Sequence, residues 1–431
     1  MKGMNKQLKL EKAYISLIIF ILLFNIPVFS KCSSEPDITA GSAILVDNTY
    51  GKVLYAKNEN EKMYPASTTK ILTAILAIEN CNNLDDIVTV PYEAIATITP
   101  GYSIAALQAG EQISVRNLLS VLLVHSANDA ANVLAYYVSG SVDNFVTLMN
   151  NKVAELGLKN THFTNPSGMH DENHYTTASD LAQIMRYCIK NPTFKSICKQ
   201  QHCTIPATNK YEQRFFVSTN DLIIPTSTYY YKYAICGKTG YTTQAKNTLV
   251  TFAEKDGFEL ISVVLSVGVY PNNISGKFTE TKSLFEYGYN SYEKIKIREK
   301  NAIAEQIEIK NGTKDTKNLD LLISDDIYAI AKSDESTENI EPEIQIDGNL
   351  MAPIAKNKKV GTITYEIDGV KYSADLIASH SVKKSSFTKL LIQIIFIIII
   401  LFLLYKILFG QNNNRKKSPY RKHKNSSKLR K

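Results

Sequence analysis

The sequence "YPASTTKILTAILAIEN" (Tyr64–Asn80) sets a short polar cluster directly before a run of apolar, helix-forming residues. Residues three positions apart share one face of a helix, so the amine of Lys70 can reach the hydroxyl of Ser67. A serine hydroxyl is a weak nucleophile until a base takes its proton, and a lysine can act as that base when burial and a nearby cation lower its pKa. An ordinary helix start, with Ser67 as N-cap and Lys70 on the surface, would use the same residues. The segment by itself leaves both interpretations open.

Two further polar clusters occur later in the chain. "HSANDAAN" places Ser126–Asn128 at the end of an apolar helical run, where short polar side chains fit poorly unless they face a cleft. "GKTGYT" places Lys238–Gly240 just before a β-rich segment. A second lysine facing the same cleft would lower the pKa of Lys70 and keep it available as a base. Ser-x-x-Lys, Ser-x-Asn and Lys-Thr-Gly, in this order, are the signature of penicillin-recognising serine enzymes.

The order of predicted elements around these clusters indicates the fold class. Residues 43–56 alternate as strand, turn and strand, and residues 114–158 carry apolar residues at helical spacing. Residues 248–267 form two β-rich runs joined by Asp256-Gly257, a strong hairpin signal. We therefore expect an α/β (α+β) domain in which both ends of the chain build an antiparallel sheet around an inserted helical lobe. Such a layout leaves a cleft between the sheet and the lobe.

The motifs and the segments around them resemble the D-alanyl-D-alanine carboxypeptidases, the low-molecular-mass penicillin-binding proteins. The resemblance covers residues 38–290 and includes "LMNNKVAELGLKNTHFTNPSGMHDENHYTTASDLA". It implies a β-lactamase/transpeptidase-like fold, and removal of the terminal D-alanine from peptidoglycan pentapeptides through an acyl-enzyme. The implied partners are peptidoglycan stem peptides as substrates and β-lactams as inhibitors. Residues 291–380 read as a small all-β domain and are similar to the C-terminal domain of the same family.

The resemblance implies a role for each residue at the reacting bond. Ser67 would be the nucleophile and Lys70 the base that takes its proton. Ser126 would relay a proton to the leaving D-alanine amine, and Asn128 would hydrogen-bond the substrate backbone. The backbone N–H groups of Ser67 and Tyr241 would form the oxyanion hole, as fixed donors aimed at the developing negative charge.

The same resemblance implies a binding site for the terminal carboxylate of the substrate. Lys238 would supply positive potential, and Thr239 would donate a hydrogen bond to the carboxylate. Gly240 would let the substrate peptide lie along a strand edge without a side-chain clash. Lys277 stands where relatives often carry an arginine that helps to bind the carboxylate.

Histidines raise the question of a metal site. His170 and His174 are four residues apart, and His162 and Asp171 lie close by in the sequence. The segment "NPSGMHDENH" is rich in turn formers rather than helical, so the spacing does not place both rings on one helix face. We expect neither a metal nor another cofactor.

Cysteines do not follow the C-x-x-C spacing of a redox or zinc motif. Export of the chain would permit a disulfide between Cys188 and either Cys198 or Cys203, although the spacing requires none. Cys236 lies two residues before Lys238 and would share its strand face. A cysteine nucleophile would leave Ser67 and Lys70 unexplained, so we interpret Cys236 as a packing residue.

Three other functions remain as alternatives. A β-lactamase on the same scaffold needs a carboxylate for deacylation, and "ELGLKN" (Glu155–Asn160) matches the loop of that class only superficially, because Lys159 replaces an asparagine. A D,D-endopeptidase would use the same chemistry on cross-linked peptides. A non-catalytic wall-binding protein would have no reason to keep all three motifs.

The two ends of the chain read as targeting and anchoring segments. Residues 1–30 combine lysines with an apolar stretch, which predicts a signal peptide. Residues 390–409 form a nearly continuous apolar run, long enough to span a bilayer. Residues 410–431 contain nine Lys or Arg and no acidic residue, which predicts a cytoplasmic tail. We therefore expect a single-pass protein of the cell membrane with its catalytic domain outside.

Net charge argues against a nucleic-acid partner. The total of +8 includes +3 from residues 1–30 and +10 from residues 406–431, so the exported remainder carries −5. A phosphate backbone is bound by positively charged surfaces, whereas the net charge of this part of the chain is negative.

At 431 residues, the chain is long enough for a sizeable core and a second domain.

Overall fold

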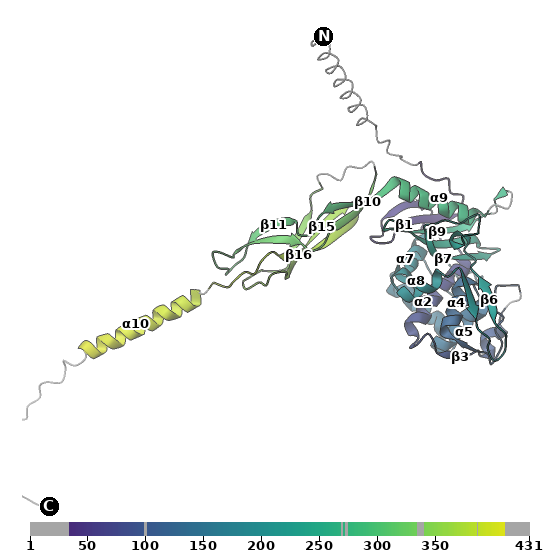
Figure 1. The fold of residues 1–431 in the computed structure, drawn as a ribbon, viewed down its shortest axis with the longest axis horizontal. Coiled ribbons are helices and arrows are strands. Elements are labelled where there is room, and N and C mark those ends of the chain that lie inside the picture. The colour runs from purple at the N-terminus through teal and green to yellow at the C-terminus, as the bar shows by residue number, and fades with distance from the viewer. Residues whose placement is uncertain are drawn as a thin grey trace, which may run out of the picture. The chain divides into compact units, whose positions relative to one another are not determined.

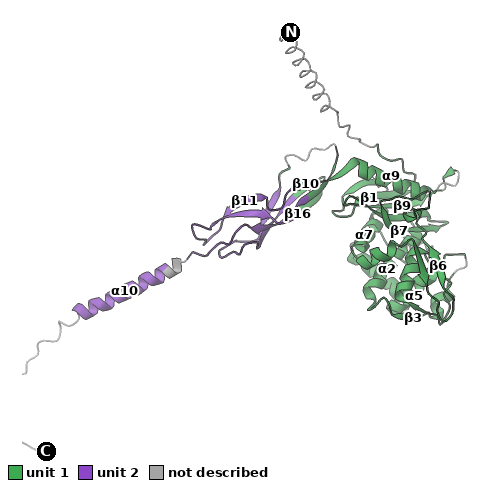
Figure 2. Ribbon diagram, in the orientation of Figure 1, with its two compact units in different colours: residues 1–297, 328–341, 365–372 green, residues 298–327, 342–364, 373–431 purple. Residues whose placement is uncertain are grey.

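The structure, a computed structural model, falls into two compact units (Figures 1 and 2). One unit comprises residues 1–297, 328–341 and 365–372, and the other comprises 298–327, 342–364 and 373–431. The predicted signal peptide at 1–30 and the predicted tail at 410–431 lie outside the described residues. The structure describes residues 34–98, 101–268, 270–271, 275–333, 340–385 and 387–409.

A five-stranded antiparallel sheet forms the centre of the first unit. Its strands, in spatial order, are β2 (Val53–Lys57), β1 (Ser42–Asp47), β9 (Phe258–Val267), β8 (Lys246–Lys255) and β7 (Ala234–Thr242). Both predicted hairpins, β1–β2 and β8–β9, are confirmed. Asp256 and Gly257 in the β8–β9 turn have φ values of 51° and 76°, and such positive values favour a turn that suits a two-residue hairpin.

Helices cover both faces of this sheet, as Figure 1 shows for α9 on one face and the helical lobe on the other. Ile44 and Val46 of β1 belong to the hydrophobic core of the lobe, whereas Ala43 and Leu45 belong to the core beneath α9. Successive strand residues point to opposite faces, so the run "AILV" serves two cores at once. The helices are α2 (Lys70–Asn80), α3 (Tyr92–Ala96), α4 (Val115–Val124), α5 (Asn128–Ser139), α6 (Val142–Glu155), α7 (Ala178–Ile189), α8 (Pro192–Cys198) and α9 (Gly276–Ser291).

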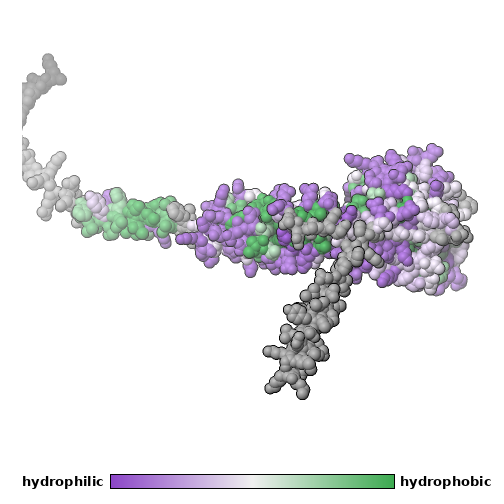
Figure 3. Space-filling view, turned by 90° about the horizontal axis from the view of Figure 1, so that it is seen from above, coloured by the Kyte–Doolittle hydropathy of each residue, from purple (hydrophilic) through white to green (hydrophobic). Residues whose placement is uncertain are grey.

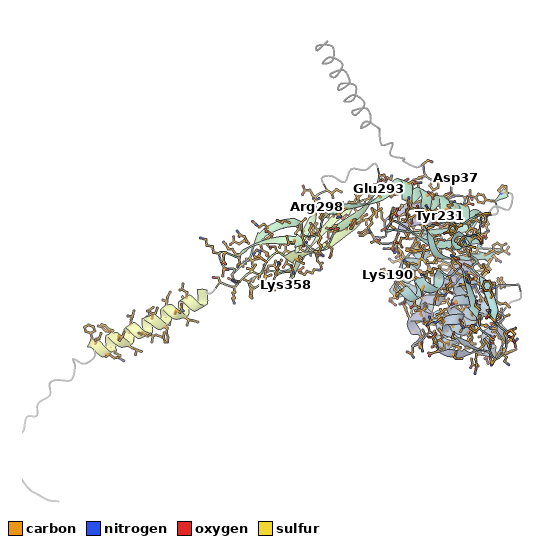
Figure 4. All side chains as sticks on the ribbon, viewed as in Figure 1. Asp37, Lys190, Tyr231, Glu293, Arg298 and Lys358 are labelled. Atoms are coloured by element: carbon orange, nitrogen blue, oxygen red, sulfur yellow. The ribbon has the colours of Figure 1, made fainter. Side chains whose placement is uncertain are left out.

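Aromatic side chains fill much of the core beneath α9. Tyr231, labelled in Figure 4, stacks on Phe285 of α9 with ring centroids 5.8 Å apart. Tyr289, one turn farther along α9, continues the stack from Phe285 with centroids 6.4 Å apart. The layer fixes α9 on the sheet through large apolar areas.

The segment that opens the lobe differs in one detail from the expected helix start. A short 3₁₀ turn, η1 (Ala66–Thr69), comes first and α2 begins at Lys70. Residues 70–77 are buried without interruption, so α2 runs through the centre of the lobe. A helix that is enclosed on all sides has to be apolar around its circumference, which explains the sequence "ILTAILA". Lys70 is the ionisable exception within that buried stretch.

Two short hairpins and a small ribbon complete the described secondary structure of the first unit. The strands β5 (His202–Ile205) and β6 (Arg214–Val217) pair as one arm, and the short helix η2 (Asp221–Ile223) follows it. The others are β3 (Ile87–Thr89) with β4 (Gln112–Ser114), and β10 (Tyr292–Arg298) with β13 (Ile327–Lys332).

Most residues of the second unit form the expected all-β domain. Its five-stranded sheet has the order β11-β12-β16-β15-β14. The turn between β15 and β16 contains Asp368 and Gly369, both with positive φ, as the Asp-Gly hairpin signal predicts. The strands are β11 (Ile303–Glu308), β12 (Asn318–Ile323), β14 (Glu343–Ile346), β15 (Lys359–Ile367) and β16 (Val370–Ala378).

The chain's predicted span is a single helix, α10 (Phe387–Phe409). Its residues from Leu390 onward form a continuous hydrophobic segment in Figure 3, and in Figure 4 their side chains project all around the helix. Residues 390–409 are long and apolar enough to cross a membrane, and none of this stretch is buried within the protein. The fold class is thus confirmed: an antiparallel sheet with a helical lobe, an all-β domain and one apolar C-terminal helix.

A loop packs tightly against the turn that precedes α2, and a glycine makes this contact feasible. Gly168 has a φ of +81°, and a Cβ atom there would lie 1.9 Å from the carbonyl oxygen of Ala66. Gly257 in the β8–β9 turn has a similar φ of +76°, but a Cβ atom there would meet no atom within 4 Å. The two glycines thus share a backbone conformation and differ in their surroundings.

We expect Gly168→Ala to destabilise the chain more than Gly257→Ala. Both variants carry the left-handed backbone cost of about 1–2 kcal/mol. The Gly168 variant also has to displace a backbone carbonyl, and overpacking of this kind costs about 1–3 kcal/mol more. Urea unfolding followed by near-ultraviolet circular dichroism measures the difference. Equal losses in the two variants would contradict the close contact with Ala66.

Candidate active site

The three motifs meet in one cleft of about 490 Å³ between the sheet and the helical lobe. Ser67 comes from η1, Ser126 and Asn128 from the junction of α4 and α5, and Thr239 from the edge strand β7. The position of the cleft agrees with the expectation from the order of elements. The residues that line it are Ser67, Gly101, Tyr102, Ser103, Ser126, Asn128, Thr219, Thr239, Gly240, Tyr241, Thr242, Thr243 and Lys277.

Lys70 is buried and its amine has three oxygen partners. Nζ lies 2.9 Å from Ser67 Oγ, 2.6 Å from Asn128 Oδ1 and 2.6 Å from the carbonyl oxygen of Ser167. The amide and carbonyl oxygens can only accept hydrogen bonds, whereas the serine hydroxyl can also donate one. In a neutral amine, the two hydrogens therefore go to Asn128 and Ser167. The nitrogen lone pair then faces the hydroxyl of Ser67, which is the arrangement a base requires.

Burial lowers the pKa of Lys70 well below its ordinary value, and the charge of Lys238 lowers it further. The carboxylate of Asp129 acts in the opposite direction, but backbone N–H groups of the 105–107 loop already hydrogen-bond to it. Burial likewise lowers the pKa of Lys238 to about 7, with a further contribution from the charge of Lys277. The lobe and the sheet thus favour a neutral amine at Lys70.

A backbone loop supplies one of the two oxygens that hold Lys70. Asn165 Oδ1 accepts hydrogen bonds from the N–H groups of Ser167 (3.2 Å), Gly168 (2.8 Å) and Met169 (3.0 Å). An asparagine that folds a turn around its own side chain is a common way to fix a loop without secondary structure. The turn presents the carbonyl of Ser167 to Lys70. Sequence reasoning missed Ser167, because a backbone carbonyl leaves no side-chain signal.

His174 supports the same region and is not available for a metal. The N–H of Thr164 donates to Nδ1 (3.1 Å), so the ring hydrogen of the neutral form sits on Nε2 and donates to Thr69 Oγ1 (2.8 Å). Burial lowers the pKa of His174 to about 3, so the ring stays neutral at physiological pH. Across the ranges that the structure describes, no three His, Cys, Asp or Glu residues are arranged to hold a metal ion.

The strand β7 approaches the nucleophile turn closely at Gly240. A Cβ atom on this residue would lie 2.8 Å from the backbone nitrogen of Ser67 and 2.4 Å from Thr248 Oγ1. Thr248 on the neighbouring strand donates to the carbonyl of Pro65 (3.0 Å), which ties the sheet to the same turn. Tyr241 follows with an exposed side chain at the cleft. The resemblance predicts a glycine that leaves room for a substrate peptide, whereas in the structure the missing side chain lets the strand meet the Ser67 turn.

Ser126 and Asn128 are two positions apart in the sequence but differ in their contacts. Ser126 has a φ of +68°, a value rare for residues with a side chain, and is nearly buried at the cleft wall. Within the described residues, no hydrogen bond joins its hydroxyl to Lys70 or Lys238. Asn128 contacts Lys70 directly, and its N–H donates to the carbonyl of Ser103 (2.8 Å). The structure therefore brings Ser126 into the cleft without connecting it to either lysine.

Lys238, Thr239 and Lys277 lie toward one end of the site. The buried amine of Lys238 donates to the carbonyl of Thr239 (3.0 Å). Lys277 lines the cleft and donates to Asn247 Oδ1 (3.2 Å). Thr239 Oγ1 lies 2.7 Å from Thr219 Oγ1, a cleft residue outside the three motifs that sequence reasoning also missed. The amine of Lys277 and the hydroxyls of Thr219 and Thr239 line the cleft, and donors of this kind suit an anionic group.

Other residues considered from the sequence lie apart from this constellation. Glu155 forms an ion pair with Lys152 (2.9 Å) on α6, is exposed and is not one of the described cleft residues. The cysteines at 188, 198, 203 and 236 are buried free thiols. Cys198 Sγ donates to the carbonyl of Gly237 (3.7 Å), which places it behind β7 rather than in the cleft.

Two known protein families match this chain, each over a different stretch. Residues 30–268 match the family described as D-alanyl-D-alanine carboxypeptidase. Residues 292–384 match the family described as the C-terminal domain of penicillin-binding protein 5.

Individual relatives are similar over most of their length. The chain is 32% identical over 380 residues to D-alanyl-D-alanine carboxypeptidase DacF from Bacillus subtilis, which covers 86% of this chain and 93% of the relative. It is 33% identical over 343 residues to D-alanyl-D-alanine carboxypeptidase DacA from Haemophilus influenzae, which covers 78% of this chain and 83% of the relative.

Solved structures agree with these relatives. Penicillin-binding protein 5 from Haemophilus influenzae has a TM-score of 0.66 and 31% identity, over 82% of this chain and 100% of that one. Penicillin-binding protein 3 from Streptococcus pneumoniae, described as a peptidoglycan synthesis regulatory factor, has a TM-score of 0.71 and 26% identity, over 81% of this chain and 100% of that one. The chain therefore belongs to the D-alanyl-D-alanine carboxypeptidase family.

Proposed function

We propose that the chain is a serine-type D-Ala-D-Ala carboxypeptidase that removes the terminal D-alanine from peptidoglycan stem pentapeptides through an acyl-enzyme. The observation that carries the proposal is the buried Lys70 amine, whose two acceptor oxygens aim its lone pair at Ser67 Oγ. Family membership supports the reaction class. The enzyme would act in the synthesis and remodelling of the cell wall.

Acylation would start with proton transfer from Ser67 Oγ to the neutral amine of Lys70. The serine oxygen attacks the carbonyl carbon of the penultimate D-alanine, and the N–H groups of Ser67 and Tyr241 stabilise the oxyanion. The C–N bond then breaks, and the leaving D-alanine amine receives, through Ser126, the proton that Lys70 took from Ser67, so that the amine of Lys70 is neutral again. Water hydrolyses the ester, which restores the hydroxyl of Ser67 and releases the shortened peptide.

Recognition of the free C-terminus would rest on the cationic end of the cleft. Thr239 donates a hydrogen bond to the carboxylate, and Lys238 and Lys277 supply positive potential. Asn128 hydrogen-bonds the substrate backbone, and Gly240 lets β7 lie close to Ser67, beside the bond that is cleaved. β-Lactams, which carry a carboxylate and a reactive amide, would acylate Ser67 in the same place.

Two alternatives receive less support from the site. A β-lactamase needs a carboxylate that activates water for deacylation, and Glu155 is exposed and paired with Lys152. A non-catalytic wall-binding protein would gain nothing from a buried lysine aimed at a serine, because burying an ammonium group is costly. A D,D-endopeptidase would use the same residues, and substrate choice distinguishes it.

We also propose that α10 anchors the enzyme in the cell membrane as a single span. Its apolar length supports this role, and the basic residues after it favour a cytoplasmic tail. The catalytic domain would then face the cell wall, where its substrate lies.

Substrate choice tests the reaction. The full chain should cleave a peptide ending in D-Ala-D-Ala, and should cleave the C-terminal amide of the same peptide at least about tenfold more slowly, because the amide removes the charge that Lys238 and Thr239 hold. Muropeptide digests analysed by mass spectrometry should show pentapeptides becoming tetrapeptides while cross-linked dimers persist.

Ser67→Ala is the control for this experiment. The variant should lose both turnover and labelling by a tagged penicillin, whereas the wild-type label should map to Ser67. Equal turnover of acid and amide, or preferential cleavage of dimers, would favour an endopeptidase. Labelling at Ser126 or Cys236 would refute the choice of nucleophile.

The pH dependence of acylation tests the base. Acylation by a chromogenic β-lactam should rise with pH as Lys70 loses its proton. Lys238→Met removes a charge that lowers the pKa of Lys70. The pKa of Lys70 should therefore rise, and the increase in acylation rate should occur at higher pH than in the wild type. Lys238→Arg keeps the charge at every pH, so its acylation rate should rise at the same pH as in the wild type or at a lower one. If the acylation rate of the Met variant rises at the same pH as that of the wild type, the charge of Lys238 does not lower the pKa of Lys70, which would contradict the prediction.

Protease accessibility tests the anchor. Protease added to intact cells should remove the catalytic domain and spare residues 415–431, whereas permeabilised cells should lose both. Protection of the catalytic domain in intact cells would overturn the proposed orientation.

A further inference from the structure

We propose that Thr219 is a positioning residue that aims the hydroxyl hydrogen of Thr239 at the terminal carboxylate of the substrate. The inference rests on the proposed function, because it adds a residue to recognition of the same carboxylate. Thr219 lies between β6 and η2 and belongs to none of the three motifs. Its two hydrogen bonds join the two walls of the cleft.

The backbone holds Thr219 in a defined place beside the helical lobe. Its N–H donates to the carbonyl of Val124 (3.1 Å), the last residue of α4 and two residues before Ser126. The preceding N–H, that of Ser218, donates to the carbonyl of Gln201 (2.8 Å). The backbone of Thr219 is therefore held by the lobe and by the segment that precedes β5.

The side chain reaches across to the sheet. Thr219 Oγ1 lies 2.7 Å from Thr239 Oγ1, and both residues line the cleft together with Lys277. Thr219 is partly exposed, whereas Thr239 is buried to 6% exposure. The contact thus connects the lobe to the hydroxyl that we propose binds the carboxylate.

The hydrogens available in this pair decide what the contact can do. Each hydroxyl carries one hydrogen, and the contact between the two oxygens uses one of them. If Thr239 donates to Thr219, its hydrogen is not available to the substrate. If Thr219 donates to Thr239, the hydrogen of Thr239 is free to point at an anion.

A carboxylate in the cleft selects the second arrangement. It can only accept, so the stable order is Thr219 to Thr239 to carboxylate, with both hydrogen bonds polarised in the same direction. A terminal amide presents a neutral carbonyl oxygen and gains less from that order. Thr219 is therefore expected to favour a free acid over an amide, although it acts through Thr239.

The experiment compares Thr219→Val with Thr219→Ser in the full chain purified in detergent. Valine has nearly the shape of threonine without the hydroxyl, and serine keeps the hydroxyl. The substrates are a peptide ending in D-Ala-D-Ala and its C-terminal amide. Thr219→Val should lower kcat/KM for the acid by about threefold to tenfold and for the amide by less than about twofold. Thr219→Ser should stay within about twofold of the wild type on both.

The acid-to-amide ratio separates positioning from a purely structural role. A strut that only sets the width of the cleft would reduce turnover of both substrates together, and that result would overturn the proposal. A Ser variant that loses as much acid preference as the Val variant would also overturn it. Thermal unfolding of each variant shows whether the fold is retained, and the ratio remains informative in either case.

A double variant tests whether Thr219 acts through Thr239. Adding Thr219→Val to Thr239→Val should leave the acid-to-amide ratio of the Thr239 variant unchanged, because the hydroxyl to be oriented is already gone. A further loss of the same size as in the single variant would mean that Thr219 touches the carboxylate independently, which contradicts the proposal.

If the proposed function is wrong, the wild-type chain turns over neither the acid nor the amide peptide, which distinguishes this outcome from the failure of the Thr219 proposal alone. Binding of the acid peptide to Ser67→Ala, measured by calorimetry with and without Thr219→Val, then decides the role of Thr219. Weaker binding of the acid in the double variant, with unchanged binding of the amide, supports the relay, and equal affinities refute it.

Discussion

Burial of the Lys70 amine is the constraint on which the rest of the site depends. An ammonium group loses favourable hydration when it leaves water, so an enclosed lysine tends to be neutral. The helical lobe enforces this, because α2 runs through its centre and carries Lys70 on its first turn. Oxygens from Asn128 and Ser167 then decide where the two amine hydrogens point. The packing of an apolar helix thus creates the base that a serine nucleophile needs.

The sheet supplies the complementary half of the site. Both faces of its central strands are covered by helices, and the edge strand β7 lines the cleft. Gly240 permits the strand to approach Ser67, and Lys238 on the same strand lowers the pKa of Lys70 through its charge. Lys70, Ser67 and the proposed carboxylate site are therefore held along the seam between the lobe and the sheet. Thr219 belongs to this seam, since it is fixed from the lobe and bonds to the strand.

Local patterns in the sequence predicted the parts of this arrangement that depend on neighbours in the chain. Asp256-Gly257 marks the β8–β9 hairpin, and the spacing of Ser67 and Lys70 gives their 2.9 Å contact. Contacts that depend on distant backbone could not be predicted in this way. The carbonyl of Ser167 carries no residue signature, and Thr219 meets Thr239 only because the chain returns from β6 past α4. The sequence also gives no reason for Ser126 to lack a bond to either lysine, since that depends on the 126–128 turn with its positive φ.

The open edge of β7 has a consequence for the solubility of the chain. An edge strand that pairs with a substrate peptide can offer the same backbone groups to an extended segment of another molecule. Lys238 and Gly240 counter this, because a buried charge and a missing side chain make β7 a poor template for a hydrophobic partner strand. The residues that we propose to recognise substrate would therefore also disfavour self-association through β7.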